Sequence, residues 1–229
     1  MRVAILQSNY LPWKGYFDMI KNVDLFIFHD DLQYTKLDWR NRNKIKTISG
    51  SEWLTIPCGT DTKRKICEVK PSDYKWQKSH WSKIIQNYSK AANFGSYKDF
   101  FENYYLGNNW DNLSELNQYL IKNIAKDFLF LETKFDDSRN YNLYEKKEKR
   151  VVELLQQVQA TVYLSGPSGK NYLSDEDFKG TDIKLEWMDY SFYPEYNQFF
   201  PPFDHFVSII DLLFHKGDIS IDFLNRVKS

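Results

Sequence analysis

The first 28 residues alternate between apolar runs and polar segments in an order typical of α/β proteins. The apolar run at 3–6 predicts a buried strand, apolar residues at helical spacing over 16–20 predict a helix that ends near Asn22, and the run at 24–28 predicts a second strand. Because a helix that joins two neighbouring strands over so few residues places them parallel, this unit predicts an α/β sheet.

The rest of the chain adds strands and helices without an internal repeat or a linker. Strands are expected at 53–57, 129–133, 161–164 and 183–188, with 63–69 as a candidate hairpin partner for the first. Helices are expected at 76–87, twice within 97–130, at 143–158 and at 207–214. We therefore predict one α/β domain over residues 1–229, a Rossmann-like, mostly parallel sheet flanked by helices, with a helical insertion at about 76–130.

Composition limits the classes of partner. The 31 Lys and Arg residues balance 31 Asp and Glu residues, and this zero net charge argues against binding to nucleic acid or to an anionic membrane surface. Aromatic residues make up 17% of the chain, which indicates a folded protein with a substantial core. Cys58 and Cys67 belong to no metal motif, and no apolar run suits a signal peptide or membrane span, so we expect a soluble cytoplasmic protein.

The loop after the first predicted strand is the first candidate binding site. Ligands of open α/β sheets bind beyond the carboxyl ends of the strands, often against a helix N-terminus. We expect the amides of Gln7 and Asn9 to contact a polar ligand together with Tyr10, while Gly15 allows a close backbone approach. The alternative is a loop whose amides cap the following helix. No dinucleotide fingerprint or P-loop motif is present, since the segment 165–170 lacks the required spacing.

Asp30 and Asp31 follow the second predicted strand and form the next candidate site. Because successive side chains diverge, one carboxylate can be buried as a general base or hydroxyl acceptor, or the pair can hold Mg²⁺ with retained waters. In the alternative, both are solvated or one pairs with a nearby Lys or Arg. Gln33 lies in the same polar segment, and Arg42 is a candidate anchor for a nucleotide diphosphate.

His80, in a predicted helix, is the candidate acid–base residue because histidine titrates nearest neutrality. The alternative is a partly buried structural histidine beside Trp81. His205 and His215 lack the spacing of a zinc site, so no metal site is predicted, and no cofactor motif is present.

Two further segments complete the predicted substrate-binding set. Residues 190–206 are dense in Tyr, Phe and Pro, and Tyr196 and Gln198 are kept as contacts for a sugar ring or a nucleobase. The alternative is a structural arm that packs over the core. Ser165 and Gly166 begin a turn-rich loop after a predicted strand.

Read together, these segments resemble the WbqC-like family. The resemblance rests on the following segments, in this order along the chain: AILQSNYLPWKGYF at 4–17, DDLQY at 30–34, NRN at 41–43, the His80 region, YLSG at 163–166, YL at 172–173 and SIIDLLF at 208–214. Two departures are visible, because Ser8 stands where the family often has Pro, and His215 stands where Asn is common. A looser similarity to nucleotidylyltransferase-like α/β folds lacks their HxGH histidines and bears on the fold alone.

The resemblance implies a bacterial protein associated with surface-polysaccharide gene clusters such as those for O-antigen. Some members are labelled glycine or aminoacyl transferases, which implies transfer of an acyl or aminoacyl group to a nucleotide-linked amino sugar. Gln7, Tyr10 and Arg42 would then bind the donor or nucleotide, and Asp31 or His80 would accept the amine proton. Two alternatives stay open: an ATP- and Mg²⁺-dependent nucleotidyl-transfer or adenylate-forming enzyme, and a non-enzymatic binding component of the same pathway. A homo-oligomer is also left open.

Overall fold

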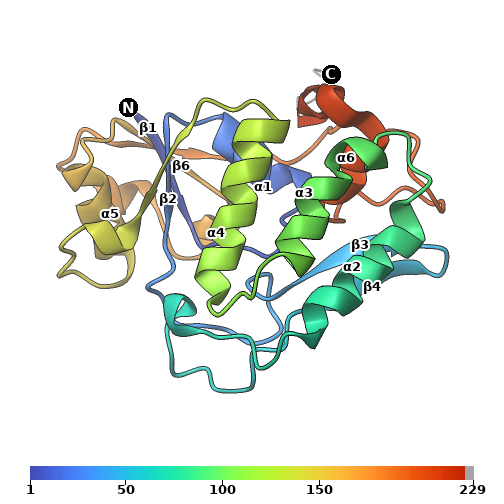
Figure 1. Cartoon of the computed structure of the whole chain (residues 1–229). Coiled ribbons are helices and arrows are strands. Elements are labelled where there is room, and N and C mark those ends of the chain that lie inside the picture. The colour runs from blue at the N-terminus through green and yellow to red at the C-terminus, as the bar shows by residue number, and fades with distance from the viewer. Residues whose placement is uncertain (225–229) are drawn as a thin grey trace.

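A five-stranded parallel sheet forms the centre of the computed structural model, which describes residues 1–224 (Figure 1). Its strands are β1 (Arg2–Leu6), β2 (Leu25–Phe28), β5 (Lys134–Asp137), β6 (Val162–Ser165) and β7 (Lys184–Trp187). They lie in the order β5-β2-β1-β6-β7, and each neighbouring pair is parallel. The predicted Rossmann-like α/β class is therefore confirmed.

Alternating side chains on the central strands build a separate hydrophobic cluster on each face of the sheet. On one face, the β1 residues Val3 and Ile5 pack with α5 (Lys147–Gln157). On the other, Ala4 belongs to a larger cluster that includes α1 (Lys14–Lys21). Both faces of β1 are thus covered, as is usual for a parallel sheet.

The larger cluster joins the sheet to a second group of elements. These are the antiparallel hairpin of β3 (Arg42–Thr47) and β4 (Gly50–Thr55), and the helices α2 (Lys75–Tyr88), α3 (Phe94–Leu106), α4 (Leu113–Asn123) and α6 (Ile209–Lys216). Figure 1 shows α5 on one side of the sheet and α4, α3 and α2 following one another on the other side. The helices expected at 76–87 and within 97–130 are present.

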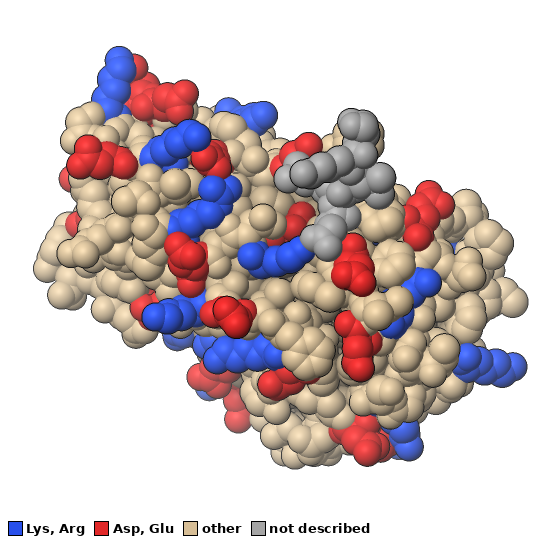
Figure 2. Space-filling view, turned by 90° about the horizontal axis from the view of Figure 1, so that it is seen from above, with Lys and Arg blue, Asp and Glu red and all other residues tan. Residues whose placement is uncertain are grey.

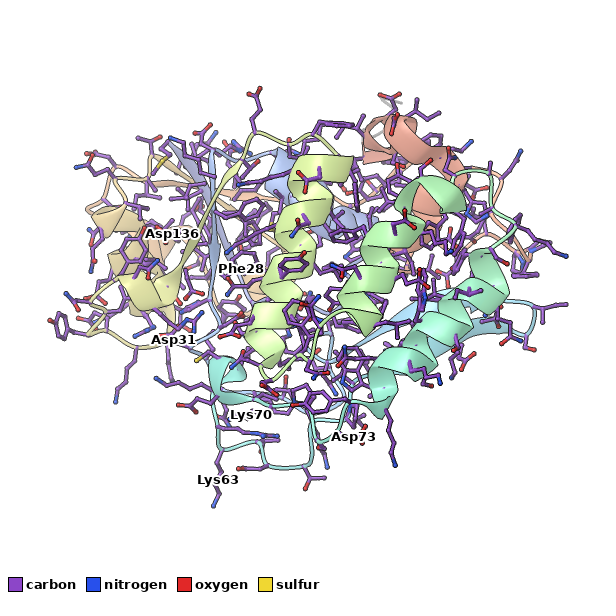
Figure 3. All side chains as sticks on the ribbon, viewed as in Figure 1. Phe28, Asp31, Lys63, Lys70, Asp73 and Asp136 are labelled. Atoms are coloured by element: carbon purple, nitrogen blue, oxygen red, sulfur yellow. The ribbon has the colours of Figure 1, made fainter. Side chains whose placement is uncertain are left out.

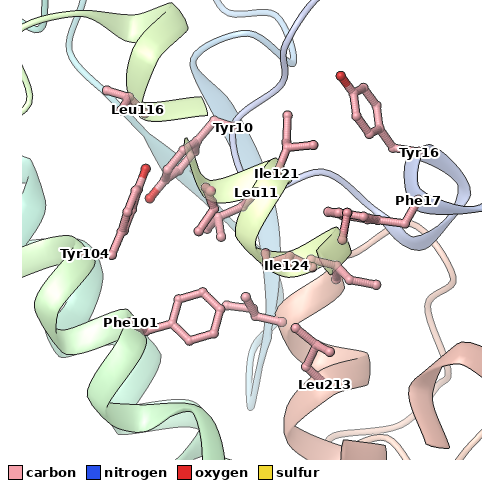
Figure 4. Packing of buried hydrophobic residues seen from close by; sticks show 14 of the residues in the cluster. Tyr10, Leu11, Tyr16, Phe17, Phe101, Tyr104, Leu116, Ile121, Ile124 and Leu213 are labelled. Carbon is pink, nitrogen blue, oxygen red and sulfur yellow. The ribbon is translucent and has the colours of Figure 1, made fainter. Parts of the chain in front are cut away.

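Aromatic and aliphatic side chains fill the space between these helices and the sheet. Figure 4 shows Tyr10 and Leu11, from the loop after β1, lying among Leu116 of α4 and Phe101 and Tyr104 of α3. All five are fully buried. The loop after β1 is therefore partly a core element, which limits how much of it a ligand can contact.

Short helical turns connect the main elements. They are a π-helical turn at Ile124–Phe128 and 3-10 turns at Ile66–Glu68, Ser138–Asn140, Pro167–Asn171, Asp175–Phe178 and Gly217–Leu224. No helix among residues 1–224 combines the length and apolar character needed to cross a membrane. Seen from above, the surface interleaves Lys and Arg with Asp and Glu, without a broad field of either sign (Figure 2).

One predicted strand pairing was wrong. The partner of β4 is β3, in the basic and polar segment 39–48, and not the segment 63–69. β3 was missed because the side chains that it buries include the polar residues Asn43 and Lys46, whose amide and ammonium groups donate to backbone carbonyls.

The strand expected at 129–133 also lies elsewhere, since β5 begins only at Lys134. The apolar residue Leu129 packs in the cluster that includes the helices, and Lys134 pairs with Leu25 at the start of an edge strand. The helix expected at 143–158 is shorter, Lys147–Gln157.

Candidate functional site

A cavity of about 560 Å³ lies at the carboxyl ends of β1, β2 and β6. It is lined by Ile5, Leu6, Gln7, His29, Leu32, Lys147, Glu148, Arg150, Val151, Tyr163 and Tyr172. Along the chain, the strands that follow β1, which are β2 and then β5, are added to the sheet on one side of β1, and the next strands, β6 and β7, are added on its other side. The crevice between β1 and β6 is therefore the topological switch point, where open α/β sheets bind their ligands.

A second cavity, of about 450 Å³, shares Arg150 with the first. It is lined by Asp31, Lys65, Cys67, Glu68, Ser138, Arg139, Tyr141, Asn142, Leu143, Tyr144 and Arg150. We call the two cavities together the carboxyl-edge cleft. Figure 3 shows Asp31 beyond the end of β2, the strand that carries Phe28. Volumes of this size are typical of pockets for small molecules and cofactors.

Three charged or titratable side chains meet where the two cavities join. Arg150 Nη2 donates to Asp31 Oδ2, and Arg150 Nε donates to His29 Nε2 at 3.4 Å. The Ser138 hydroxyl donates to Asp31 Oδ1 at 2.6 Å, and that oxygen lies 3.7 Å from His29 Nε2. Because an arginine N–H can only donate, His29 Nε2 acts as an acceptor and is unprotonated.

His29 is a functional candidate that the sequence reasoning missed. Burial lowers the pKa of its ring, the nearby Asp31 acts in the opposite direction, and Arg150 lowers the pKa further. A neutral histidine beside a carboxylate is a suitable proton acceptor near pH 7. The available signal was its position, since it directly precedes the two aspartates at the strand end.

The two aspartates have different surroundings, as the divergence of neighbouring side chains predicted. Asp31 lines the cleft, whereas Asp30 is fully buried and accepts from the Ser8 backbone N–H at 2.8 Å. The Ser114 hydroxyl and the Gln118 amide also donate to Asp30. Asp30 thus ties the loop after β1 and helix α4 to the end of β2, and its oxygens are occupied by the protein itself.

The residues of the first loop divide between the cleft and the core. Gln7 lines the cleft, and its Oε1 accepts from Arg40 Nη1 at 2.6 Å. Asn9 Oδ1 is buried and has no hydrogen-bond partner among the described residues. Tyr10 is buried in the core. A Cβ added to Gly15 would lie 2.3 Å from the Trp13 ring, so the glycine makes room for an indole.

Comparison with known proteins shows the family of this chain. The model of the WbqC-like protein family matches residues 7–223. The chain belongs to the WbqC-like protein family. An uncharacterized protein of Mycobacterium tuberculosis (strain ATCC 25618 / H37Rv), Rv1507c, is 43% identical over 225 residues, which cover 97% of each chain. No solved structure matched significantly.

Several of the segments that carry the WbqC-like resemblance meet at the carboxyl-edge cleft. The segment 4–17 contributes Gln7, the segment 30–34 contributes Asp31, and the segment 163–166 begins with Tyr163, which lines the first cavity. These segments lie far apart in the sequence and are joined by the parallel pairing of β2, β1 and β6.

Arg42 and Gln33 line neither cavity of the cleft. The Arg42 guanidinium lies over the Trp53 ring, 4.2 Å from its centroid, and its Nε is buried without a partner among residues 1–224. Gln33 is exposed, and its amide donates to the Thr62 carbonyl at 3.0 Å. Arg42 therefore lies on the hairpin, outside the cleft, whereas Arg150 lines both of its cavities.

His80 lines a different cavity, of about 420 Å³, between the hairpin and α2. It is 5% exposed, and its Nδ1 is hydrogen-bonded to the Tyr10 hydroxyl at 2.9 Å. Burial lowers the pKa of His80 to about 3, with a further lowering by Lys83. The ring is thus neutral, and the structure does not bring His80 and Asp31 to a common cavity.

The low pKa of His80 predicts a pH dependence of stability. The folded-state pKa, about 3, lies below the unfolded value of 6.5, so the contribution is complete above pH 6.5 and is lost as the pH falls towards 3. The slope reaches about 1.4 kcal/mol per pH unit in this window. Urea unfolding between pH 7 and 4.5 should show a flatter profile for His80→Gln than for the wild type. Identical slopes would contradict a buried neutral ring.

Tyr196 and Gln198 donate hydrogen bonds to Asp211 of α6. The Tyr196 hydroxyl donates to Asp211 Oδ1 at 2.6 Å, and the Gln198 amide donates to the same oxygen at 2.9 Å. Asp211 is fully buried. These contacts agree with a structural arm, because the polar groups that a ligand would need are already bound.

Ser165 and Gly166 lie at the end of β6, beside the cleft but outside its lining. Ser165 is buried, and a Cβ on Gly169 would lie 2.4 Å from the Ser165 Oγ. The turn after β6 therefore packs tightly on the strand end, and Gly169 rather than Gly166 is the glycine that this packing requires. Within residues 1–224, no group of three or more His, Cys, Asp or Glu side chains is arranged to hold a metal ion.

Proposed function

We propose that this protein is a transferase of bacterial surface-polysaccharide biosynthesis that moves an acyl or aminoacyl group to the amine of a nucleotide-linked amino sugar. The observation that carries the proposal is the carboxyl-edge cleft, with two cavities that meet at Arg150, His29 and Asp31. Membership of the WbqC-like family supports the pathway through the association of that family with polysaccharide gene clusters.

The two cavities suit the two halves of such a substrate. The first cavity, at the switch point, offers Tyr172 as an aromatic wall for a base, and Lys147 also lines it. The second offers hydroxyl, amide and carboxylate groups for a sugar, from Ser138, Asn142 and Asp31. The diphosphate then lies between the cavities, beside Arg150.

His29 and Asp31 supply the acid–base chemistry in this proposal. As the sugar amine attacks the acyl carbon of an activated donor, a C–N bond forms and the bond to the donor's leaving group breaks. The amine proton passes to the unprotonated Nε2 of His29. Asp31 Oδ1, 3.7 Å from that nitrogen, stabilises the imidazolium that results.

Two experiments test the proposed function. A nucleotide-linked amino sugar should raise the melting temperature of the purified protein, and a deletion strain should lack an acyl or aminoacyl mass on its surface glycan. Absence of any shift across a panel of nucleotide sugars would overturn the proposal. Release of pyrophosphate from ATP in the presence of sugar phosphates would indicate nucleotidyl transfer instead.

Replacement of Tyr172 tests where the base lies. Tyr172 is 56% exposed and lines the first cavity, so Tyr172→Ala should weaken binding of a nucleoside diphosphate about tenfold, the loss expected for one stacking contact. Binding of inorganic pyrophosphate should be unchanged. Phe192→Ala, which removes an exposed ring outside both cavities, is the matched control and should leave both affinities unchanged. Equal losses for the two ligands in Tyr172→Ala would place the base elsewhere.

A further inference from the structure

We propose that Arg150 is an anion switch: a phosphate group that binds Arg150 breaks its ion pair with Asp31 and frees His29 and Asp31 for catalysis. The inference rests on the proposed function and deepens it, since it names the diphosphate as the part of the substrate that activates the site. The ligand class is a diphosphate, either inorganic or within a nucleotide.

Arg150 has donor capacity left for a ligand. Its guanidinium carries five N–H groups, and the contacts with Asp31, His29 and the Leu143 carbonyl use three of them. Among the described residues, the other two N–H groups have no hydrogen-bond partner. Arg150 is the residue that both cavities share, so a ligand in either can reach it.

The other cations of the cleft are placed differently. Arg139 is committed to Asp137, through Nε and Nη2 at 2.8 Å each. Lys147, at the start of α5, and Lys65 line one cavity each. Glu148 lines the first cavity together with Lys147, and Glu68 lines the second together with Lys65, so each cavity holds an acidic group as well as its lysine. Arg150 is the cation of the cleft that both cavities share, and a bridging diphosphate can reach it from either.

Exchange of one anion for another at Arg150 keeps the guanidinium paired. A phosphate carries more charge than a carboxylate and matches the guanidinium fork in two parallel hydrogen bonds. The exchange therefore avoids an unpaired, half-buried cation, which would be costly. Binding of a neutral ligand provides no such compensation, so it leaves the ion pair intact.

Asp31 and His29 stay in place when Arg150 turns to the ligand. The Ser138 hydroxyl still donates to Asp31 Oδ1 at 2.6 Å, and it holds the carboxylate near His29. Loss of the Arg150 Nε contact exposes the lone pair of His29 Nε2, the atom that receives the proton. The contact between the phosphate and Arg150 thus both binds the ligand and makes His29 Nε2 available as the base.

The test is calorimetric titration of the full chain with inorganic pyrophosphate and, separately, with UDP, without added metal. Arg150→Gln should weaken pyrophosphate binding at least tenfold. Arg150→Lys should give an intermediate loss of affinity, because lysine keeps the positive charge but cannot form the two parallel hydrogen bonds of a guanidinium. Asp31→Asn should strengthen binding about tenfold, because the competing carboxylate is gone. Lys149→Gln, an exposed cation in the same helical turn that lines neither cavity, is the control and should change little.

The outcomes separate this inference from the proposed function. Weaker or unchanged binding in Asp31→Asn would overturn the switch, because a carboxylate that does not compete for Arg150 cannot be displaced from it. Unchanged binding in Arg150→Gln would overturn it as well. Tight pyrophosphate binding with the predicted variant pattern, but no response to any nucleotide sugar, would uphold the switch and reject the proposed substrate. Melting curves of each variant confirm that it is folded.

Discussion

Alanine in place of Asp30 is expected to lower the free energy of unfolding by about 4 kcal/mol. The substitution leaves the Ser8 backbone N–H and the Ser114 hydroxyl without their acceptor at a fully buried position. It also removes one contact of the Gln118 amide, which still donates to Asp137 Oδ2 at 2.7 Å. For a chain of this length the melting temperature should fall by roughly 10 °C. Urea unfolding at pH 7 measures the change directly.

Asp24 is the matched control for Asp30. Asp24 lies just before β2, whereas Asp30 lies just after it. The Asp24 carboxylate also accepts from a backbone N–H of the neighbouring strand β1, that of Arg2, at 2.7 Å. Because Asp24 is exposed, water replaces it in Asp24→Ala, and we expect a loss of about 0.5 kcal/mol. Equal losses for the two alanine variants would show that Asp30 does not organise the sheet edge.

The second large effect is expected at Asp211. Asp211→Ala should lower the free energy of unfolding by about 3 kcal/mol, because it leaves the buried Tyr88 hydroxyl and the Tyr196 hydroxyl without their acceptor. It also removes one of the two acceptors of the Gln198 amide, which still donates to the Asp204 carbonyl. It should also speed hydrogen exchange through residues 190–206, which lack regular secondary structure. Exchange followed by mass spectrometry measures that effect.

Glu195 provides the control within the same segment. Its side chain is 70% exposed and its contact with His205 is 4.0 Å long, so Glu195→Gln should leave both stability and exchange near the wild-type values. Affinity for pyrophosphate should be the same in folded Asp211→Ala and in the wild type, since Asp211 lines neither cavity of the cleft. Loss of that affinity alone, without loss of stability, would contradict the structural role.

The parts of the fold that could be predicted are those in which local pattern and tertiary environment agree. The first βαβ unit was readable because both faces of its strands are buried, which gives continuous apolar runs such as LFIF at Leu25–Phe28. β3 could not be read in this way, since RNKIKT carries three cationic residues and buries one of them, Lys46, against the segment 190–206. Only the folded chain reveals the carbonyl, on Pro202, that makes this burial acceptable.

The candidate site was predicted in part for a similar reason. Asp31 and Gln7 follow directly from the rule that ligands bind at the carboxyl ends of parallel strands. Arg150 and Tyr172 could not be found, because α5 and the turn after β6 reach the cleft through packing between residues more than a hundred positions apart. His80 was a candidate acid–base residue because it is titratable, but nothing in the local sequence reveals its hydrogen bond with Tyr10.

The hydrophobic clusters on the two faces of the sheet differ in size, so the two sides of the cleft differ in local stability. The strand ends belong to elements anchored by the larger cluster and by Asp30, whereas α5, which carries Arg150, is held by the smaller cluster through residues such as Leu154 and Leu155. Local opening of α5 therefore costs less free energy than opening of the strands. A ligand that contacts both the strand ends and α5 increases the free energy of opening α5 by the free energy of its own binding. The fraction of clefts occupied by ligand and the protection of α5 from local opening should therefore rise together.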